Sequence, residues 1–507
     1  MSKHPLRAAA LALAVGALPA HAQQQPPSRE PVRDEFFWLG EINKASTVIN
    51  AGQGLLDRAL APKLAQGIAK VIAAGNQPGA RRPSTVISFE PLMIEQAGVE
   101  VTLIHAGRSS QDMHATYRAA IMRDRLLALG DQLNRTTRTL VDLAATHKGT
   151  VVPNYTNGVA AQPNSYGHYL LGFAAGLDRD AQRIRETYAR VDRSPMGTTV
   201  LNGTSWPLDR KRMADYLGFS ALVDNAYDAS QIAAADLPVE AGGIVTGIAL
   251  HVGGFVEDVM TQYAQSRPWI LLREGGGNTY VSSAMPQKRN PGLLNGTRED
   301  ASTALSLTMG PVFRAHNIPP GMPDAKDAKI NSAMIESAGK ALQGLDRILK
   351  ALVIDPDRAL AELNSDWTAS QELADVLMRR YGLPFRGGHH FASEVVDHAK
   401  LNGIRPPDFP YAQAQAIYRK TAAEMRLSVT ELPMSEAEFR ATLDPVAIVR
   451  NRATSGGPQP AEMDRMLAEA KQRLDRQEGW IKDRREAITA ALAKLDTDFA
   501  ALAKSAD

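Results

Sequence analysis

The sequence predicts an all-α protein in which a long central helical bundle carries a smaller domain at each end. Apolar residues recur at helical spacing through most of its 507 residues. Only one stretch, VEVTLI at 99–104, has the composition of a short strand or an extended segment. A chain of this length can hold two or three domains or one elongated helical core. We therefore expect helices to supply nearly all of the core.

The N-terminus has the pattern of a secretory signal. Lys3 and Arg7 flank the start of an apolar run at 8–18, and Ala-His-Ala at 20–22 offers a cleavage site. The apolar run is too short to span a bilayer. We expect residues 1–22 to be a signal peptide cleaved near Ala22, and the mature protein to be periplasmic. A disordered, alanine-rich start is the alternative.

Composition excludes several classes of function. The chain contains no cysteine, which fits an oxidising compartment. It has 57 basic and 55 acidic residues, and loss of Lys3 and Arg7 leaves 57 − 2 = 55 basic ones. A neutral mature chain lacks the charge pattern that binds nucleic acid or an anionic membrane. Without a metal-ligand cluster, a P-loop or a dinucleotide fingerprint, neither metal nor cofactor is expected.

The mature chain divides into four segments. A linker rich in Gln, Pro and Ser at 23–32 is expected to be disordered. An N-terminal domain at 33–112, the helical bundle at 113–382 and a helical C-terminal domain at 383–507 follow. The last stretch, 461–506, predicts a long surface helix or helix pair, with a partner-binding coiled coil as the alternative. Helical spacing within the bundle is clearest at 113–129, 131–146, 165–177, 180–188, 239–265, 290–309 and 331–353.

One loop concentrates reactive and flexible residues. Three glycines at 275–277 permit unusual backbone angles, and two serines, a lysine and an asparagine follow before prolines stiffen the exit. Such a segment suits a lid that closes over a small substrate. An ordinary Gly/Pro surface loop is the alternative.

The sequence SSAMPQKRNP at 282–291 resembles the signature motif of the aspartase/fumarase superfamily, which includes argininosuccinate lyase. The resemblance implies that Ser282 is the general base, acting as an alkoxide, and that Lys288 and Asn290 hold a substrate carboxylate. A serine hydroxyl is a very weak acid, so it needs nearby positive charge and hydrogen-bond donors. Lys288 could supply the charge, and the loop amides could supply the donors.

Further segments resemble the same family in the same order. GRSSQD at 107–112 is similar to GRSRND and implies substrate contacts for Ser109 and Gln111. PNYTNGVAAQP at 153–163 is similar to PGYTHLQRAQP; it implies that Thr156 binds a carboxylate and that Gln162 lies in the substrate segment. The resemblance also implies a three-domain fold and a homotetramer with a twenty-helix core. Each active site would then combine segments from three subunits.

Two departures from the family concern proton transfer. The family's histidine after Tyr-Thr is Asn157, and its partner glutamate, thirteen residues after the base serine, is Asn295. An amide cannot act as a general acid or base near neutral pH. A quaternary ammonium group leaves as a neutral tertiary amine and needs no acid, so the two asparagines favour such a leaving group. A catalytically dead enzyme is the alternative.

A third departure affects the amino-acid end of the substrate. The family's Tyr and Gln in PLAYNRDLQEDK are Met322 and Asp327 here, and Lys329 matches the lysine with a one-residue slip. Ergothionase, a superfamily member that eliminates trimethylamine from ergothioneine, has the reaction that fits. Tyr117 and Tyr155 are candidates to contact trimethylammonium, since aromatic faces attract cations; the alternative is that they pack in the bundle. Lys44 could hold the thione or carboxylate, or be a solvated surface lysine.

The sequence therefore predicts a lyase that carries out cofactor-independent C–N β-elimination on a small carboxylate-bearing substrate. The most specific expectation is release of trimethylamine from ergothioneine, a betaine, to give thiourocanate. One alternative is an argininosuccinate lyase-like enzyme that cleaves an N-substituted aspartate to fumarate. Another is a catalytically silent relative that only binds a ligand.

Overall fold

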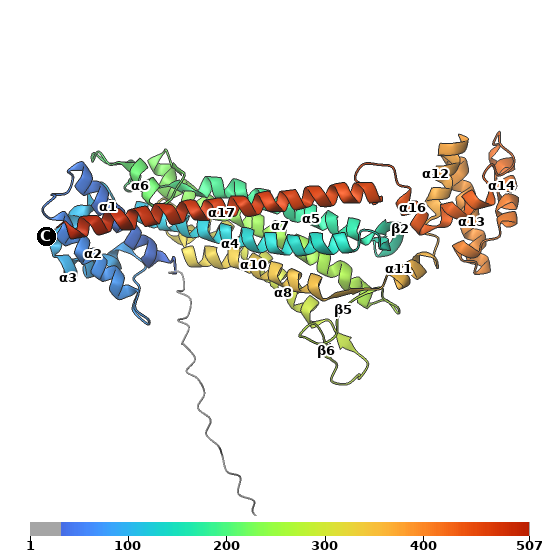
Figure 1. Ribbon diagram of the computed structural model, residues 1–507, viewed down its shortest axis with the longest axis horizontal. Helices are drawn as coiled ribbons and strands as arrows, with labels where there is room; N and C mark the ends of the chain where they lie inside the picture. Colours follow the sequence, from blue (N-terminus) through green and yellow to red (C-terminus); the bar gives the residue numbers. More distant parts are fainter. Residues whose placement is uncertain (1–31, 506–507) are drawn as a thin grey trace, which may run out of the picture.

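The computed structural model describes residues 32–505, and these form an elongated molecule with a small helical domain at each end of a long bundle (Figure 1). The all-α prediction is confirmed, because the few strands form only two-stranded ribbons. The predicted signal peptide at 1–22 and nearly all of the linker at 23–32 lie outside the described residues.

The N-terminal domain packs three helices around a shared core. Asp34 caps the first helix by accepting a hydrogen bond from the Phe37 N–H, and Gly54 in the left-handed conformation ends it. The strand or extended segment expected at 99–104 is wrong: this stretch is a 3₁₀ helix that buries Val101 and Ile104, three residues apart on one face. The elements are α1 (Glu35–Gln53), α2 (Ala61–Gly75), α3 (Val86–Ala97) and η1 (Val99–His105).

The helices of the central bundle do not all keep the limits that the sequence pattern indicates. The stretches 113–129 and 131–146 belong to one helix, α4, and 165–177 and 180–188 belong to α5. The bundle helices are α4 (Ser110–Thr146), α5 (Tyr166–Val191), α7 (Ala233–Tyr263), α8 (Gly292–Leu307), α9 (Met309–Ala315) and α10 (Ala328–Ala351). Shorter helical pieces near its N-terminal end are α6 (Arg210–Tyr216), the π-helical η2 (Asp228–Ile232) and η3 (Asp324–Lys326).

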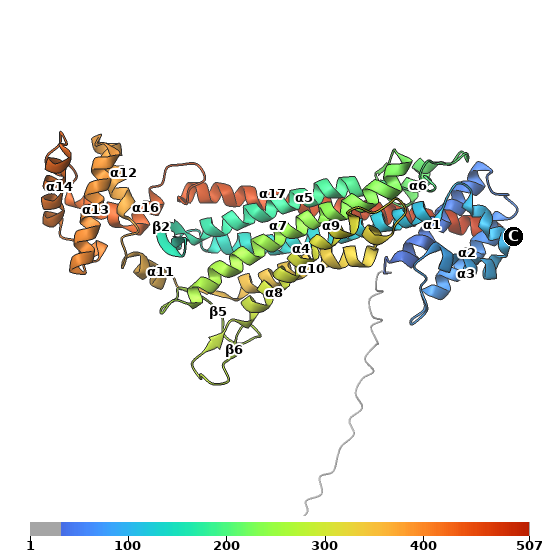
Figure 2. The same cartoon turned by 180° about the vertical axis from the view of Figure 1, so that it is seen from behind.

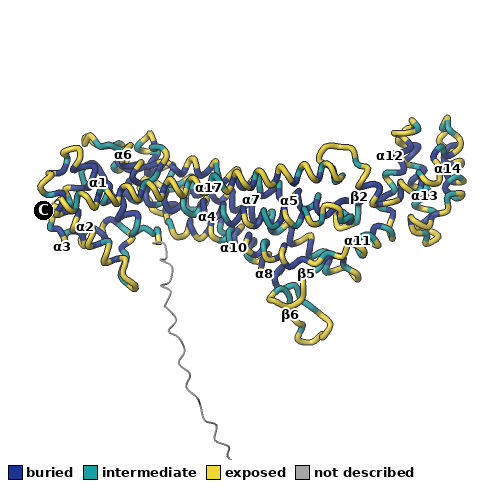
Figure 3. Tube along the Cα trace, in the orientation of Figure 1, coloured by how far each residue is buried: buried dark blue, intermediate teal, exposed yellow. Residues whose placement is uncertain are grey.

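Four two-stranded ribbons connect these helices. The antiparallel pairs are β1 (Val151–Thr156) with β2 (Val159–Ser165), β5 (Ile270–Leu272) with β8 (Leu352–Ile354), and β6 (Tyr280–Val281) with β7 (Arg289–Asn290). The parallel pair is β3 (Arg193–Ser194) with β4 (Ala221–Leu222). The ribbon β6–β7 projects from the side of the bundle as an exposed loop, seen from behind in Figure 2 and coloured by burial in Figure 3.

The C-terminal domain has its own hydrophobic core, formed by residues between Trp367 and Leu443. This core begins before residue 383, the predicted boundary. The elements of this part are α11 (Pro356–Leu363), α12 (Ser370–Tyr381), α13 (Phe385–Asn402), η4 (Pro406–Asp408), α14 (Tyr411–Met425), α15 (Glu436–Leu443) and α16 (Pro445–Arg450).

The last helix, α17 (Pro460–Lys504), leaves the C-terminal domain and runs back along the bundle (Figure 1). It is one helix of 45 residues, and its apolar side chains from Met463 to Phe499 join the main core. Helices α4, α1 and α2 pack against it. The sequence predicted a long surface helix or a helix pair here and grouped it with the C-terminal domain; in the structure it is one helix whose buried face packs on the bundle.

One helical stretch, Asp228–Tyr263, is long and apolar enough to cross a membrane by length and composition alone. Half of its most apolar window is buried inside the bundle. A core helix of a bundle passes the same test, so this stretch is weak evidence for a membrane span.

Candidate active site

The loop between β5 and α8 owes its shape to glycine. Gly275, Gly276 and Gly277 have φ angles of 78°, 60° and 80°, in the left-handed region that disfavours side chains. The chain then pairs Tyr280 with Asn290 and Val281 with Arg289 before entering α8. Residues 283–288 between the two strands are exposed, whereas Ser282 is half-buried, so the tip of this hairpin is free to meet another surface.

Ser282 lies at the first turn beyond β6, and backbone groups surround its hydroxyl. The Ser282 Oγ accepts hydrogen bonds from the N–H of Met285 at 3.2 Å and of Ala284 at 3.4 Å. The Ser282 N–H donates to the Lys288 carbonyl at 3.2 Å, which fixes both residues in one hairpin. Backbone donors aimed at a hydroxyl oxygen lower the cost of placing negative charge on it.

The ribbon β1–β2 carries Thr156 and Asn157 at its tip. Asn157 and Gly158 both have positive φ angles, 52° and 75°, the geometry of a tight Asn-Gly hairpin turn. The left-handed backbone of this turn therefore favours asparagine at position 157, independently of any role in proton transfer. Gln162, on β2, donates from its Nε2 to the Gln371 Oε1 at 2.5 Å and links the ribbon to α12.

Asn295 lies in the first turn of α8 and is half-buried. Its backbone N–H donates to the Pro291 carbonyl, directly after the hairpin that carries Lys288 and Asn290. Unlike Asn157, Asn295 occupies ordinary helical backbone. The backbone conformation at position 295 therefore does not by itself favour asparagine.

Ser109 and Gln111 lie at the start of α4, in a segment that is held rigidly. The Ser109 Oγ accepts from the Gln111 N–H at 3.1 Å and donates to the Thr199 carbonyl at 3.0 Å. The Asp112 carboxylate accepts from the N–H groups of Gly197 and Thr199, at 2.9 and 3.1 Å. Burial raises the pKa of Asp112 to about 6, and these backbone donors oppose the shift.

A single chain does not bring the predicted segments together. Ser109 caps the N-terminal end of α4, whereas Thr156 and Asn157 follow its C-terminal end. The 37 residues of α4 span about 55 Å at 1.5 Å per residue. Residues at the two ends of α4 therefore cannot contact one small molecule within one chain.

Tyr117 and Lys329 lie toward the N-terminal end of the bundle. Tyr117 is only 6% exposed, with the Arg118 guanidinium 5.7 Å from its ring centroid and the His114 ring 5.2 Å away. Burial raises the pKa of its hydroxyl. Lys329 starts α10, where its backbone N–H donates to Asp327 at 2.9 Å.

Lys44 is neither open to solvent nor turned toward the other site residues. Its Nζ lies 2.7 Å from Glu41 and 2.6 Å from Asp496, joining α1 to α17. Burial acts to lower its pKa, but the two carboxylates raise it above the usual value. In this arrangement its charge stabilises helix packing.

Tyr155 lines a cavity of about 500 Å³ beneath the β1–β2 ribbon, which Asn157 also borders. The Tyr155 hydroxyl donates to Glu362 and accepts from the Trp269 Nε1 at 3.0 Å. Burial raises its pKa to about 12. The sequence analysis did not identify its aromatic neighbours Tyr166, Tyr169 and Trp269 as cavity residues. Tyr166 and Tyr169 are three residues apart at the start of a helix, and this spacing could have predicted that their rings share one face.

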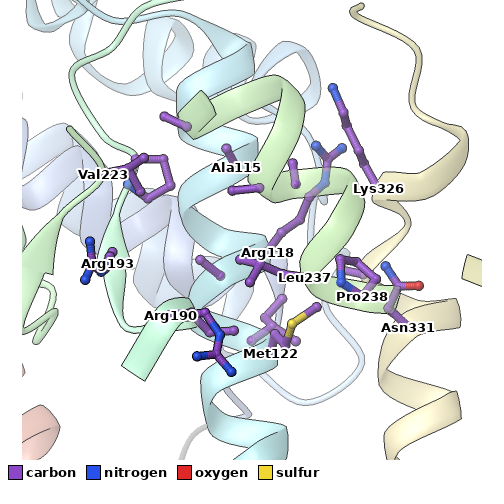
Figure 4. Close-up of a pocket in the computed structure, with 18 of the residues that line it drawn as sticks. Ala115, Arg118, Met122, Arg190, Arg193, Val223, Leu237, Pro238, Lys326 and Asn331 are labelled. Carbon is purple, nitrogen blue, oxygen red and sulfur yellow. The ribbon is translucent and has the colours of Figure 1, made fainter. Parts of the chain in front are cut away.

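A second hollow, of about 50 Å³, lies between α4, α7 and α10 (Figure 4). Arg118 and Lys326 line it among apolar side chains. The buried Lys326 donates from its Nζ to the Gln231 Oε1 at 3.0 Å, and burial lowers its pKa. Within residues 32–505, no group of three His, Asp or Glu residues is placed to hold a metal.

Comparison with known proteins identifies relatives over most of the chain. Residues 67–303 match the Lyase family, and residues 367–450 match the argininosuccinate lyase C-terminal family. The argininosuccinate lyase of Methanoculleus marisnigri is 31% identical over 413 residues, 80% of each chain. Argininosuccinate lyase 1 of Shouchella clausii is 26% identical over 92% of this chain and 93% of its own.

Solved structures share the fold. The crystal structure of EDDS lyase in complex with formate superposes with a TM-score of 0.84, at 24% identity over 93% of this chain and 92% of that one. Fumarate lyase from Mesorhizobium sp. BNC1 gives 0.62 at 16% identity, over 86% and 96% of the two chains. Both similarities concern the arrangement of helices.

Proposed function

Because the chain belongs to the aspartase/fumarase superfamily and is a carbon–nitrogen lyase, we propose that it eliminates a tertiary amine from a quaternary ammonium substrate. The best candidate substrate is ergothioneine, which would give trimethylamine and thiourocanate. The observation that carries this proposal is the pair of neutral amides, Asn157 and Asn295, at the positions where the family has its histidine and glutamate.

In the proposed reaction the Ser282 alkoxide removes the proton from the carbon next to the thioimidazole ring. The electron pair of that C–H bond forms the new C=C bond, and the C–N bond breaks with its electrons leaving on nitrogen. Trimethylamine departs as a neutral molecule, so no proton has to be supplied. Two neutral amides also avoid placing an imidazolium beside the fixed cation of the substrate.

The base assignment is supported by the backbone donors at Ser282, since the N–H groups of Ala284 and Met285 already point at its oxygen. Lys288 and Asn290 follow in the same hairpin, and we assign to them the substrate carboxylate. The ring receives the charge of the carbanion. No cofactor enters the proposed reaction.

Assembly is part of the proposal. Superfamily enzymes are typically homotetramers that act on small carboxylate substrates. The separation of Ser109 from Thr156 along α4 supports a site shared between subunits, because only another copy can bring a second Ser109 segment to the Thr156 end. We propose three contributing subunits: one giving Ser109 and Gln111, one giving Thr156 and Asn157, and one giving the Ser282 hairpin.

A second candidate reaction is cleavage of an N-substituted aspartate to fumarate. Relatives named argininosuccinate lyase favour it, as do the retained Thr156, Lys288 and Asn290. This reaction releases an amine that must be protonated, and neither asparagine can donate that proton. It therefore ranks second. A silent binding relative ranks third, because the base hairpin is intact.

The deciding experiment supplies the mature chain, residues 23–507, with ergothioneine, and follows thiourocanate absorbance together with trimethylamine. We expect both products in equal amounts. Fumarate release from argininosuccinate with no reaction on ergothioneine would favour the second candidate. Binding of either compound without turnover would favour the silent relative.

Export is a separate proposal. We propose a periplasmic protein, from the pattern of Lys3, Arg7 and the Ala-His-Ala site. Fractionation of cells that express the full chain, followed by N-terminal sequencing, tests it. A mature N-terminus near Gln23 in the periplasmic fraction is expected, and an intact Met1 in the cytoplasm would refute it.

A further inference from the structure

The cavity beneath the β1–β2 ribbon has an unusual combination of aromatic and acidic walls. It lies between that ribbon, the start of α5, the end of α7 and β5, and its volume is about 500 Å³. This volume is within the range of pockets that hold small organic molecules, roughly 300–1,000 Å³. Its aromatic and acidic lining residues are Tyr155, Tyr166, Tyr169, Trp269, Glu257 and Asp258.

The aromatic wall is fixed by contacts among its members. The ring of Tyr166 stacks on that of Tyr169 at 5.6 Å between centroids, and meets the Trp269 ring edge-on, also at 5.6 Å. Trp269 donates to the Tyr155 hydroxyl, and Tyr169 donates to the Asp258 carboxylate at 2.7 Å. Tyr166 and Trp269 are only 2% and 5% exposed, so they hold the half-buried rings of Tyr155 and Tyr169 in place at the cavity. Rings held in this way need not be ordered on binding, which lowers the entropy cost.

Two buried polar atoms at this cavity have no protein partner. They are the hydroxyl of Tyr166 and the Oε1 of Gln262, and both residues are 2% exposed. A buried polar group without a hydrogen bond destabilises the folded state. A core that served only packing would carry phenylalanine and leucine here. Both atoms are closed off from the open space of the cavity, so they make the layer behind its aromatic lining polar but do not themselves contact a ligand.

The charge of the lining is negative. Glu257 and Asp258 stand on the exposed side of α7, and among the described residues that line the cavity there is no lysine, arginine or histidine. Aromatic faces with carboxylates attract organic cations, whose charge is spread over alkyl groups, and repel anions. Asn157 borders the same cavity and connects it to the proposed reaction centre.

We propose that this cavity binds the trialkylammonium group of the substrate, with Tyr155 and Tyr169 supplying the ring faces, Trp269 and Tyr166 holding those rings in place, and Asp258 supplying the charge. The identity of the group as part of a substrate rests on the proposed function. The proposal that the cavity binds an organic cation rests on its lining residues alone. Tyr155 is therefore one of several aromatic residues that line this cavity.

The test titrates mature wild-type protein with tetramethylammonium chloride, by calorimetry and by tryptophan fluorescence, at constant ionic strength with sodium chloride as the reference. Neopentyl alcohol, an uncharged molecule of similar shape, is the competing probe. We expect saturable binding of tetramethylammonium that is about tenfold tighter than that of the alcohol, as a cation–π contribution near 1.4 kcal/mol gives.

Two substitutions locate the binding. Asp258→Asn removes the charge and should weaken tetramethylammonium binding about tenfold, whereas Asp464→Asn, an exposed carboxylate that pairs with Lys148 outside the cavity, should leave it unchanged. Trp269→Leu should abolish the fluorescence response and the binding. Circular dichroism of each variant shows that the helices are intact.

Three results would overturn the cavity assignment: no saturable tetramethylammonium binding by folded wild type, equal affinity for the alcohol, or equal weakening by the two aspartate changes. Turnover of ergothioneine without tetramethylammonium binding would refute the cavity and leave the proposed function standing. Saturable binding that Asp258→Asn weakens, with no turnover of any betaine, would refute the function and support the cation site.

Discussion

The backbone N–H of Met285 donates to the Oγ of Ser282 at 3.2 Å, inside a hairpin that stands clear of the bundle. The donor comes from the turn itself, so it accompanies the serine wherever the hairpin moves. Such a donor would stabilise negative charge on the hydroxyl oxygen, as the proposed role of Ser282 as the base requires. Lys288 is fixed in the same turn by its N–H bond to the Met285 carbonyl.

Ser282→Ala removes the proposed base and keeps the hairpin. We expect kcat to fall by about 10²–10⁴-fold, the usual contribution of a general base. The oligomer should stay intact by size-exclusion chromatography, because the hydrogen bonds of this half-buried side chain lie within its own hairpin. Ser283→Ala, one residue along, is the matched control and should keep most of the activity. Near-normal turnover by Ser282→Ala would contradict the assignment.

Asn157→His tests whether an acid is needed. Histidine tolerates the left-handed φ of 52° better than most residues, so the turn should survive. If the amine leaves unprotonated, the imidazole adds nothing, and kcat on a quaternary substrate should not rise. The double variant Asn157→His with Asn295→Glu should behave in the same way. Steady-state kinetics measure this effect, and a clear gain in kcat for either variant would contradict departure of the amine without a proton donor.

Helical periodicity was enough to predict the bundle, but it could not fix the ends of the helices or their neighbours. The sequence left the end of the helix that starts at Met113 open beyond Leu129, and it divided α5 near Arg179, where charged residues interrupt the apolar pattern. Both helices continue because tertiary packing covers their other faces. The apolar stripe of α17 showed that the helix is buried on one side. It did not show that the partner is the bundle.

For the site, the sequence predicted the motif segments but not the tertiary contacts of the residues around them. The assignment of Ser282 and Thr156 by resemblance stays a prediction; Thr156 lies in an exposed turn, and Ser282 is half-buried at the start of its hairpin loop. The sequence could not foresee that Lys44 pairs with Asp496, 452 positions away, or that Trp269 joins Tyr166 and Tyr169 in one wall. Such contacts depend on how distant segments fold together.

Acid should weaken the N-terminal part of the fold through His114. Its Nε2 accepts the Val86 N–H at 3.2 Å, and burial, then Arg118, lowers its pKa to about 4. In the unfolded chain the pKa is about 6.5, so between these values the unfolded state binds more protons. The free energy of unfolding should therefore fall as the pH drops from 6.5 to about 4.

Urea unfolding at pH 7.5, 6 and 5 measures this effect. His105, whose pKa burial and Arg108 lower to about 4, acts in the same direction, so His114→Gln should flatten only part of the slope. The change at exposed His316→Gln is the control and should keep the wild-type slope. Equal slopes for wild type and His114→Gln would show that the hydrogen bond to Val86 does not depend on this titration.

Gly167 sets how closely the start of α5 approaches the end of α4. A Cβ at this position would lie 2.5 Å from the Ala144 carbonyl oxygen and 2.7 Å from the Lys148 Cα, both backbone atoms that cannot turn aside. Gly167→Ala should therefore cost about 1–3 kcal/mol of unfolding free energy, as overpacking does. Because Tyr166 precedes Gly167, the shift should also weaken tetramethylammonium binding.

The matched control is Gly172→Ala, five residues further along α5, where nothing lies within 4 Å of the added Cβ. It is exposed and helical, so alanine should add about 0.5–1 kcal/mol. Thermal and urea unfolding of both variants, with the cation titration repeated on each, separate the two effects. If Gly167→Ala proved as stable as Gly172→Ala, the close approach of α4 and α5 would not constrain the wall that begins at Tyr166.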